Sequence, residues 1–347
     1  EIRIRGTSFK WFRSFLSGRC QRPRLGSTLS EVVTLLFGVP QGSVLGPVLF
    51  NIYIRSLYST IKSFGFAAQG YADDQQIYKT FKAGQQVNIL SSKLQECFML
   101  IQHWMADYCL KLNPSKTKIM VLSHPKILKN ITIRGAQLTD DVCIRFSSTA
   151  KSLGIHMDEN LTMQPQVMAL KRDCFRLIRN IRKMSFILSK DQLKLVMNSL
   201  VVCKLDYCNA LYHGINEKYL DELQRIQNAA AKVVFNLYKH DHLGDTLKIL
   251  HWLPIRERIN YKILLIVYKS LNGMGPIYLQ DLLNYANFNH NIHLVEPRVY
   301  SAMGERAFQK CAPKLWNSIP VPIKECDTLE GFKSKLKTHL FEIAYGQ

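Results

Sequence analysis

The chain has 347 residues, of which 46 are Lys or Arg and 26 are Asp or Glu, so its formal net charge is +20. A hydrophobic share of 47% with only 18 Gly and 12 Pro excludes a disordered basic tail, a collagen-like chain and a low-complexity chain. At about 150 residues per domain, the length predicts two or three domains with a substantial core. The excess of positive charge favours a phosphate-bearing partner, with nucleic acid first and an anionic membrane second.

No targeting segment or metal site is expected. The residues up to Trp11 are charged and lack an apolar run, and no window approaches about 18 uninterrupted apolar residues, so we expect neither a signal peptide nor a membrane span. None of the nine cysteines has CxxC spacing, and Cys203, Cys208 and His213 would fall on different faces of a helix. Buried free thiols in an intracellular, soluble protein of the nucleus or cytoplasm are therefore expected.

The first part of the chain mixes helix and strand signals. A cluster of Gly and Pro residues precedes an apolar run, and with Ser43 as the N-cap and Pro47 in the first turn it predicts a helix over 45–61. Residues 64–81 carry Gly70 and the Asp73–Asp74 pair between aromatic-rich runs, which predicts a β-hairpin with both Asp residues at or beside the turn. Further along, periodicity predicts an amphipathic helix over 87–110 and strands over 118–122, 131–134, 142–146 and 152–157.

From Met163 onward the period is helical almost throughout, which places a domain boundary near residue 160. The predicted helices cover 164–186, 190–203, 217–238, 244–251, 255–271 and 329–343. Trp252 and Trp316 are assigned to packing, since aromatic residues at helix ends belong to a core more often than to a base-stacking surface. Asp206 and Tyr207 are likewise interpreted as structural.

The Asp73–Asp74 pair is the first candidate for chemistry. Phosphoryl transfer onto a growing strand uses two divalent metals held by carboxylates, and magnesium prefers such hard oxygen ligands. A hairpin tip is a suitable place to present carboxylates, although an Asp-Asp turn without chemistry is the commoner case.

The loop before the predicted helix at 45–61 is the second candidate. Its glycines permit a close approach of the backbone to a nucleotide, and a helix N-terminus favours phosphate. A tight structural turn that leads into a core helix is the alternative.

Two long segments resemble one family. Residues 37–54, FGVPQGSVLGPVLFNIYI, and 71–78, YADDQQIY, resemble the palm of reverse transcriptases from non-LTR retrotransposons (LINE elements), especially the jockey-like group. Shorter matches to later family segments follow in the same order at 112–118, 151–155, 205–209 and 312–320. The resemblance implies an α+β fold with a partial right-hand polymerase palm over 1–160, followed by an all-helical part with a thumb-like region at 161–240 and a C-terminal region at 241–347.

The resemblance also implies residue roles. Asp73 and Asp74 would be catalytic metal ligands, with Mg²⁺ or Mn²⁺ as the ion, and an RNA template and a DNA primer or target would be the partners. Neither a membrane nor an obligate protein partner is expected. The implied contacts to nucleotide and template are Gln41, Gly42, Ser43 and Lys116, and the implied primer grip is Leu153 and Gly154. An exposed lysine and a buried turn are the structural alternatives for Lys116 and for the primer grip.

One departure from the family bears on activity. These polymerases need another Asp from an upstream Ala-Phe-Asp type motif, but of the 72 residues before Asp73 only Glu1 and Glu31 are acidic. Residues 6–19, GTSFKWFRSFLSGR, resemble the family segment that follows this motif. We therefore expect an N-terminally truncated palm that is inactive alone, because two adjacent Asp residues on one turn cannot surround two metals. Arg55 and Lys118 replace an uncharged residue and an acid of the family pattern.

A basic ridge is predicted on the helix at 164–186. Its members are Arg172, Arg176, Arg179 and Lys183, which are spaced by four, three and four residues and so share one helix face. Such a ridge suits the backbone of a nucleic-acid duplex, and a solvated helix face is the alternative. Three interpretations thus remain open: a polymerase domain, a non-catalytic RNA- or DNA-binding remnant, and a truncated palm that does not fold stably.

Overall fold

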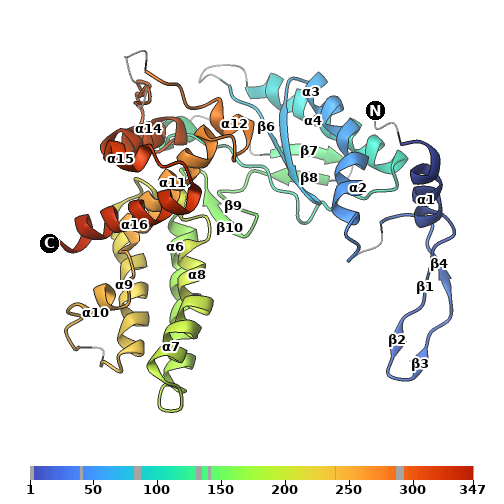
Figure 1. Cartoon of the computed structure of the whole chain (residues 1–347). Helices are drawn as coiled ribbons and strands as arrows, with labels where there is room; N and C mark the ends of the chain where they lie inside the picture. Colours follow the sequence, from blue (N-terminus) through green and yellow to red (C-terminus); the bar gives the residue numbers. More distant parts are fainter. Residues whose placement is uncertain are drawn as a thin grey trace. The chain divides into compact units, whose positions relative to one another are not determined.

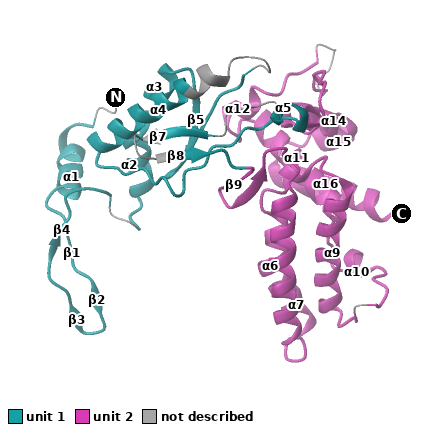
Figure 2. Cartoon of the chain, turned by 180° about the vertical axis from the view of Figure 1, so that it is seen from behind, with its two compact units in different colours: residues 1–147 teal, residues 148–347 magenta. Residues whose placement is uncertain are grey.

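The computed structural model describes residues 4–39, 42–81, 87–129, 135–139, 142–238, 240–286 and 293–346 (Figure 1). The chain divides into two compact units, residues 1–147 and residues 148–347 (Figure 2). Within the described ranges, no helix combines the length and the apolar character that crossing a membrane requires.

The first unit begins with elements that bury little. Helix α1 (Gly6–Leu16) has no buried side chain. A long antiparallel ribbon follows, in which β1 (Cys20–Gln21) pairs with β4 (Val33–Thr34) and β2 (Arg24–Leu25) pairs with β3 (Thr28–Leu29). All the residues of these short strands are exposed, so the core of this unit must lie elsewhere.

The helix expected over 45–61 is two helices, α2 (Gly46–Tyr53) and α3 (Arg55–Ser63). The single-helix prediction was wrong because the chain makes a turn at Ile54, with φ of −83° and ψ of −3°, which divides the segment into α2 and α3. The Ile54 side chain is buried at this break, so tertiary packing overrides the continuous helical pattern.

The predicted hairpin is confirmed as β5 (Ala67–Tyr71) paired antiparallel with β6 (Asp74–Tyr78). Helix α4 (Val87–Asp107) confirms the predicted amphipathic helix and contacts the second hairpin through β7. That hairpin is β7 (Gly135–Thr139) with β8 (Val142–Arg145), and α5 (Pro125–Leu128) is a single short turn. The core of the unit consists of Ile54, Leu57, Ile61, Phe66, Cys97, Phe98, Ile101, Trp104 and Ile144.

Two strand predictions in the first unit are not confirmed. The segment 118–122 is not a strand, because it makes only an isolated parallel bridge between Ile119 and Phe146 and no continued ladder. The strand expected at 131–134 lies outside the described residues.

The second unit begins with a hairpin where one strand was expected at 152–157. β9 (Thr149–Ser152) pairs with β10 (Ile155–Asp158). The prediction was wrong because Leu153 and Gly154 both have positive φ, 46° and 85°, and so form a two-residue turn inside the predicted strand.

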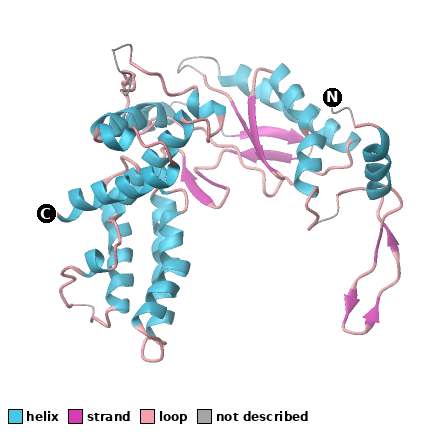
Figure 3. Cartoon of the chain, viewed as in Figure 1, coloured by secondary structure: helices cyan, strands magenta, loops and turns pink. Residues whose placement is uncertain are grey.

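Helices make up most of the rest of this unit (Figure 3). The helix predicted over 255–271 is confirmed with the same ends as α11 (Ile255–Leu271). Three others are confirmed with a shifted C-terminal end, namely α6 (Gln164–Arg182), α9 (Glu217–Val234) and α16 (Leu329–Tyr345). The helix expected over 190–203 is α7 (Lys190–Met197), a π-helical turn η1 (Asn198–Val202) and α8 (Cys203–Asp206). The remaining short helices are η2 (Asn209–Tyr212), α10 (Thr246–Ile249), α12 (Ile277–Gln280), α13 (Ala302–Glu305), α14 (Phe308–Ser318) and α15 (Val321–Lys324).

One continuous core runs through these helices. α6 packs against α9, and α11 packs against α14 and α16. Trp252 and Trp316 are both buried in this core, which confirms their assignment to packing. All nine cysteines are free, but only Cys97, Cys174 and Cys311 are buried, so the expectation of buried thiols holds for these three alone.

Candidate functional site

The tip of the β5–β6 hairpin presents two adjacent carboxylates. Tyr71 pairs with Asp74 in the ladder, so Ala72 and Asp73 form the two-residue turn. Ala72 has φ of 53°, a left-handed conformation that costs a residue with a Cβ about 1–2 kcal/mol. The hairpin therefore holds a conformation that Ala does not favour, in order to turn within two residues.

A chain of hydrogen bonds from α3 fixes this tip. The Tyr58 hydroxyl donates to Gln75 Oε1 over 2.8 Å, and Gln75 Nε2 donates to the Ala72 carbonyl over 2.8 Å. Gly70 makes room for this arrangement, since a Cβ there would lie 2.0 Å from the Tyr58 hydroxyl. Helix α3 is itself anchored in the core through Leu57 and Ile61, so the core positions the turn.

Asp73 and Asp74 are both exposed at this braced tip. Their oxygens are the ligand type that hard divalent cations prefer. Among the described side chains, however, no three His, Cys, Asp or Glu residues come together as a metal site. The two carboxylates can thus contribute to a metal site, but as a pair they do not form a two-metal centre.

The glycine-rich loop leads into α2 as expected. Gly42 has φ of 81°, and the Ser43 hydroxyl accepts a hydrogen bond from the Gly46 amide over 3.0 Å. Ser43 thus satisfies the first amide of α2, although Leu45 occupies the cap position itself. Gln41 lies outside the described residues.

Lys116 lies in a separate turn after α4. Asn113 organises this turn, because its side-chain oxygen accepts from the Ser115 hydroxyl over 2.7 Å and from the Lys116 amide over 3.3 Å. The Lys116 side chain is exposed.

The turn at Leu153 and Gly154 belongs to the second unit and is held there by Tyr207. The Tyr207 hydroxyl donates to the Leu153 carbonyl over 2.7 Å, and a Cβ on Gly154 would lie 3.7 Å from the tyrosine ring. Two segments that lie more than fifty residues apart in the sequence, 151–155 and 205–209, therefore meet in space.

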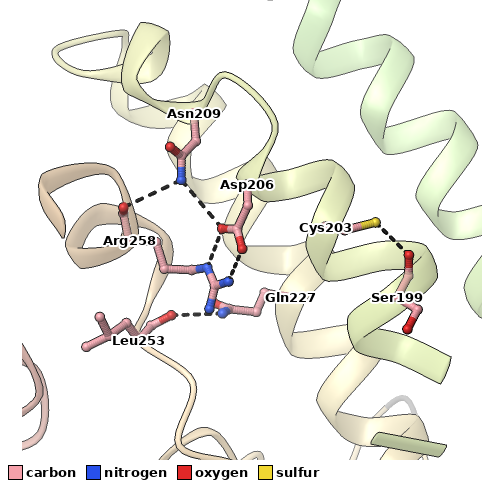
Figure 4. A network of polar contacts seen from close by, with 7 residues as sticks. All are labelled: Ser199, Cys203, Asp206, Asn209, Gln227, Leu253 and Arg258. Carbon is pink, nitrogen blue, oxygen red and sulfur yellow. Dashed lines mark hydrogen bonds and ion pairs between the residues drawn. The ribbon is translucent and has the colours of Figure 1, made fainter. Parts of the chain in front are cut away.

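Asp206, next to Tyr207, has a structural role (Figure 4). Its carboxylate accepts from Arg258 Nε over 2.8 Å and from the second guanidinium nitrogen, and Asn209 Nδ2 approaches both Asp206 and the Arg258 carbonyl at 3.5 Å. Nearby, Gln227 Nε2 donates to the Leu253 carbonyl over 2.9 Å. The Asp206–Arg258 bonds join α8 to α11, which confirms the structural interpretation of Asp206. The Gln227 bond joins α9 to the segment that precedes α11.

The basic ridge lies on the outward face of α6. Arg172 and Arg176 expose 77% and 68% of their side chains, and Arg179 and Lys183 are also exposed. Asp173 approaches the first two at 3.5 and 3.8 Å, which is a weak interaction between exposed groups.

The neighbouring cations on α6 point elsewhere. Lys171 pairs with Glu222 over 2.7 Å, and its hydrogen bond lowers the pKa of that carboxyl. Arg182 donates to the Leu237 carbonyl over 2.9 Å. The opposite face of α6 buries Val167, Cys174 and Ile178, so the helix separates its basic ridge from the core.

Sequence reasoning missed the residues that hold the candidate site. The Tyr58–Gln75 brace carries no sequence signal, because a tyrosine on a helix and a glutamine on a strand are ordinary at those positions. The same is true of Arg306, whose guanidinium donates to the carbonyls of Leu161, Leu211 and His213 and fastens the start of α6 to the following helices.

Residues 2–157 match the family model for reverse transcriptase (RNA-dependent DNA polymerase). The probable RNA-directed DNA polymerase from transposon BS of Drosophila melanogaster is 29% identical over 176 residues, which cover 49% of this chain and 19% of that protein. The RNA-directed DNA polymerase from mobile element jockey of Drosophila funebris is 25% identical over 213 residues, 60% of this chain and 22% of that protein.

A third relative is similar over a longer stretch. The Pol polyprotein from type-1 retrotransposable element R1 2 of Nasonia vitripennis is 20% identical over 288 residues, which cover 78% of this chain and 67% of that protein. The chain thus spans about a fifth of the two Drosophila relatives and two thirds of the third.

Proposed function

The chain carries a reverse transcriptase domain of the non-LTR retrotransposon type over residues 2–157, as its motifs predicted, and from this premise we propose that Asp73 and Asp74 are metal-binding carboxylates of that domain. The observation that carries the proposal is their exposure at a turn braced by Tyr58 and Gln75. Polymerases of this kind use divalent metal ions. Mg²⁺ or Mn²⁺ is the ion we propose here.

The proposal extends to the surroundings of the hairpin and to the chain's partners. RNA template and DNA primer or target would be the partners, with Gly42, Ser43, Gln41 and Lys116 facing nucleotide and template. Leu153 and Gly154 would lie at the primer end. Residues 1–160 would be a partial palm, with a thumb-like region over 161–240 and a C-terminal helical region over 241–347.

We further propose that these 347 residues alone synthesise little or no DNA. Two-metal chemistry needs carboxylates on more than one side of the ions. Glu31 is the only acidic residue between Arg5 and Asp73, and it is exposed in a loop before β4. No third carboxylate of the described residues joins the Asp73–Asp74 pair.

A metal titration with two readouts tests both statements. Paramagnetic Mn²⁺ should broaden the backbone amide signals of residues 71–75 in the purified chain, and Asp73→Asn with Asp74→Asn should abolish this broadening. Primer extension on an RNA template should stay at the level of the double variant with either Mg²⁺ or Mn²⁺. Robust extension by the unaltered chain would refute the inactivity proposal, whereas an unchanged amide spectrum would refute the metal-binding role.

The second candidate is a nucleic-acid-binding module without synthesis, and the ridge on α6 favours it. A cation that contacts a phosphate releases counterions, so replacing it lowers affinity and the salt dependence together. Changing Arg172, Arg176, Arg179 and Lys183 to Gln should lower the slope of log K against log salt by about one for each lost contact.

A matched control removes the same number of exposed cations outside α6. Its positions are Lys204, Lys248, Lys314 and Lys337, all changed to Gln. The control should keep most of the affinity and slope of the unaltered chain. Equal losses in the two variants would mean that net charge, not the ridge, attracts the nucleic acid.

A further inference from the structure

The turn between α6 and α7 exposes three apolar side chains. Met184, Phe186 and Ile187 are 51%, 84% and 69% exposed. They stand at the end of the long helix that carries the basic ridge, directly after Lys183 (Figure 1). We refer to these three residues as the apolar turn.

Local hydrogen bonds and buried anchors hold the apolar turn in its exposed position. The amides of Met184 and Ile187 donate to the carbonyls of Ile181 and Met184 over 2.9 and 3.0 Å. Ile181 on one side is buried, and Ser189 on the other side starts α7 with a capping box that includes Gln192. The chain is therefore ordered through the turn, and its apolar side chains are presented outward from a fixed backbone.

Because the side chains of the apolar turn are exposed, they do not contribute the stability that their burial would provide. Fully burying a Phe, Ile or Met side chain stabilises a fold by about 1.5–3 kcal/mol each. Leu188, next in the sequence, does pack against the core of the second unit. Three exposed apolar residues within four positions of an ordered turn are typical of a contact surface.

The charges beside the apolar turn favour nucleic acid as the partner. The ridge from Arg172 to Lys183 extends for about 16 Å along α6 at 1.5 Å per residue and ends at the apolar turn. A strand whose phosphates follow the ridge would therefore bring its bases to the turn. A helix that lies on a membrane needs its apolar face beside its cations, but the apolar face of α6 is packed into the core.

We propose that the apolar turn is a stacking surface for unpaired bases of a nucleic-acid strand whose backbone lies along α6. The proposal rests on the binding role proposed for the ridge and adds the mode of contact. The Phe186 ring stacks on a base, and Ile187 and Met184 cover its edges. Stacking tolerates any sequence because every base has a π-face.

The test compares two RNA–DNA duplexes of equal total phosphate number at one salt concentration, one with an unpaired template overhang and one blunt. Phe186→Ala should weaken binding of the overhang duplex about 5- to 150-fold, the range for one lost base stack. The affinity for the blunt duplex should not change. Phe186→Trp should retain the affinity and Phe186→Leu should not. Tyr300→Ala, which removes another exposed ring, is the control and should change neither affinity.

A second readout locates the contact directly. 5-Iodouridine in the overhang should photocrosslink to Phe186 in the unaltered chain, and the crosslink should be lost with the Phe186→Ala variant. Since Phe186 is largely exposed, its replacement should leave the thermal unfolding of the chain unchanged, which a melting curve verifies.

Failure of this proposal is distinguishable from failure of the ridge. If the ridge variant loses affinity while Phe186→Ala binds both duplexes normally, the ridge binds nucleic acid and the stacking proposal is wrong. If the unaltered chain binds neither duplex, the proposed nucleic-acid binding is wrong as well. If Phe186→Ala loses binding to phosphatidylserine vesicles but not to the overhang duplex, the apolar turn contacts lipid and the proposal is overturned.

Discussion

In residues 1–147 the most distinctive sequence motifs lie at the surface over a small core, whereas residues 148–347 surround a much larger core with helices. Asp73, Asp74 and Gly42 are all exposed. Helix α1 buries nothing, and the exposed large apolar residues of the first unit include Leu25, Leu36 and Val44.

This contrast separates two kinds of constraint on the sequence. Packing does not require the residues at 71–74, because exposed positions accept many side chains with little change in stability. We propose that their match to polymerases reflects chemistry. In the second unit the corresponding matches at 205–209 and 312–320 contain Asp206 and Trp316, which hold helices together.

The largest expected effect is on the core of the second unit. Phe332 is fully buried and stacks on Tyr268 with ring centroids 4.1 Å apart. Phe332→Ala should lower the free energy of unfolding by about 3–5 kcal/mol, because it removes a large buried ring and leaves a cavity. Urea titration of chain labelled with 5-fluorotryptophan should show earlier unfolding at the Trp252 and Trp316 fluorine signals.

The Trp104 signal reports on the first unit and should keep its midpoint in this variant. Phe186→Ala is the control for loss of an exposed ring and should shift no signal. An equal shift at Trp104 would show that the two units unfold together and that the contrast between them has no thermodynamic meaning.

The next effect concerns the hairpin brace. Gly70→Ala should lower the free energy of unfolding of the first unit by about 1–3 kcal/mol, because the new Cβ would lie 2.0 Å from the Tyr58 hydroxyl. The urea midpoint measured at the Trp104 signal should fall, and the midpoints measured at Trp252 and Trp316 should not change.

A double-mutant cycle with Tyr58→Phe checks the cause. Removing the hydroxyl relieves part of the clash, so Gly70→Ala should cost less in the Tyr58→Phe background than alone. Strictly additive costs would mean that the hydroxyl does not set the size limit at position 70.

These contacts also explain what the sequence could and could not predict. The hairpin at 67–78 and the long helices were predictable because turn residues and a helical period are local signals. The break at Ile54 and the turn at Leu153 were not, since each depends on packing that the local pattern does not encode. For the candidate site, the motif gave Asp73 and Asp74, but the partners of the turns, Tyr58 and Tyr207, are separated from Gln75 and Leu153 by 17 and 54 residues.

A smaller effect is expected at the turn of the β9–β10 hairpin. Tyr207→Phe removes the hydrogen bond to the Leu153 carbonyl and should lower the free energy of unfolding of the second unit by about 0.5–1.5 kcal/mol. Amide hydrogen exchange at Gly154 and Ile155 should accelerate. Tyr300→Phe removes an exposed hydroxyl and serves as the control, and equal exchange rates in the two variants would exclude Tyr207 as the support of this turn.

The smallest expected effect is a pH dependence that only the second unit should show. Burial lowers the pKa of His213, and the nearby cations Lys314, Arg306 and Arg256 lower it further, whereas its hydrogen bond with the Asn260 side chain raises it. In the unfolded chain the ordinary pKa is about 6.5, so as pH falls below this value the unfolded state binds a proton that the folded state resists. The free energy of unfolding should therefore fall as the pH is lowered from 7.5 to 5.5.

His213→Gln should reduce this fall as measured at Trp316, and His240→Gln, at an exposed position, should not. Since the Trp104 signal reports on the other unit, the pH dependence measured there should contain no contribution from His213. A contribution at Trp104 would mean that protonation of one unit changes the stability of the other.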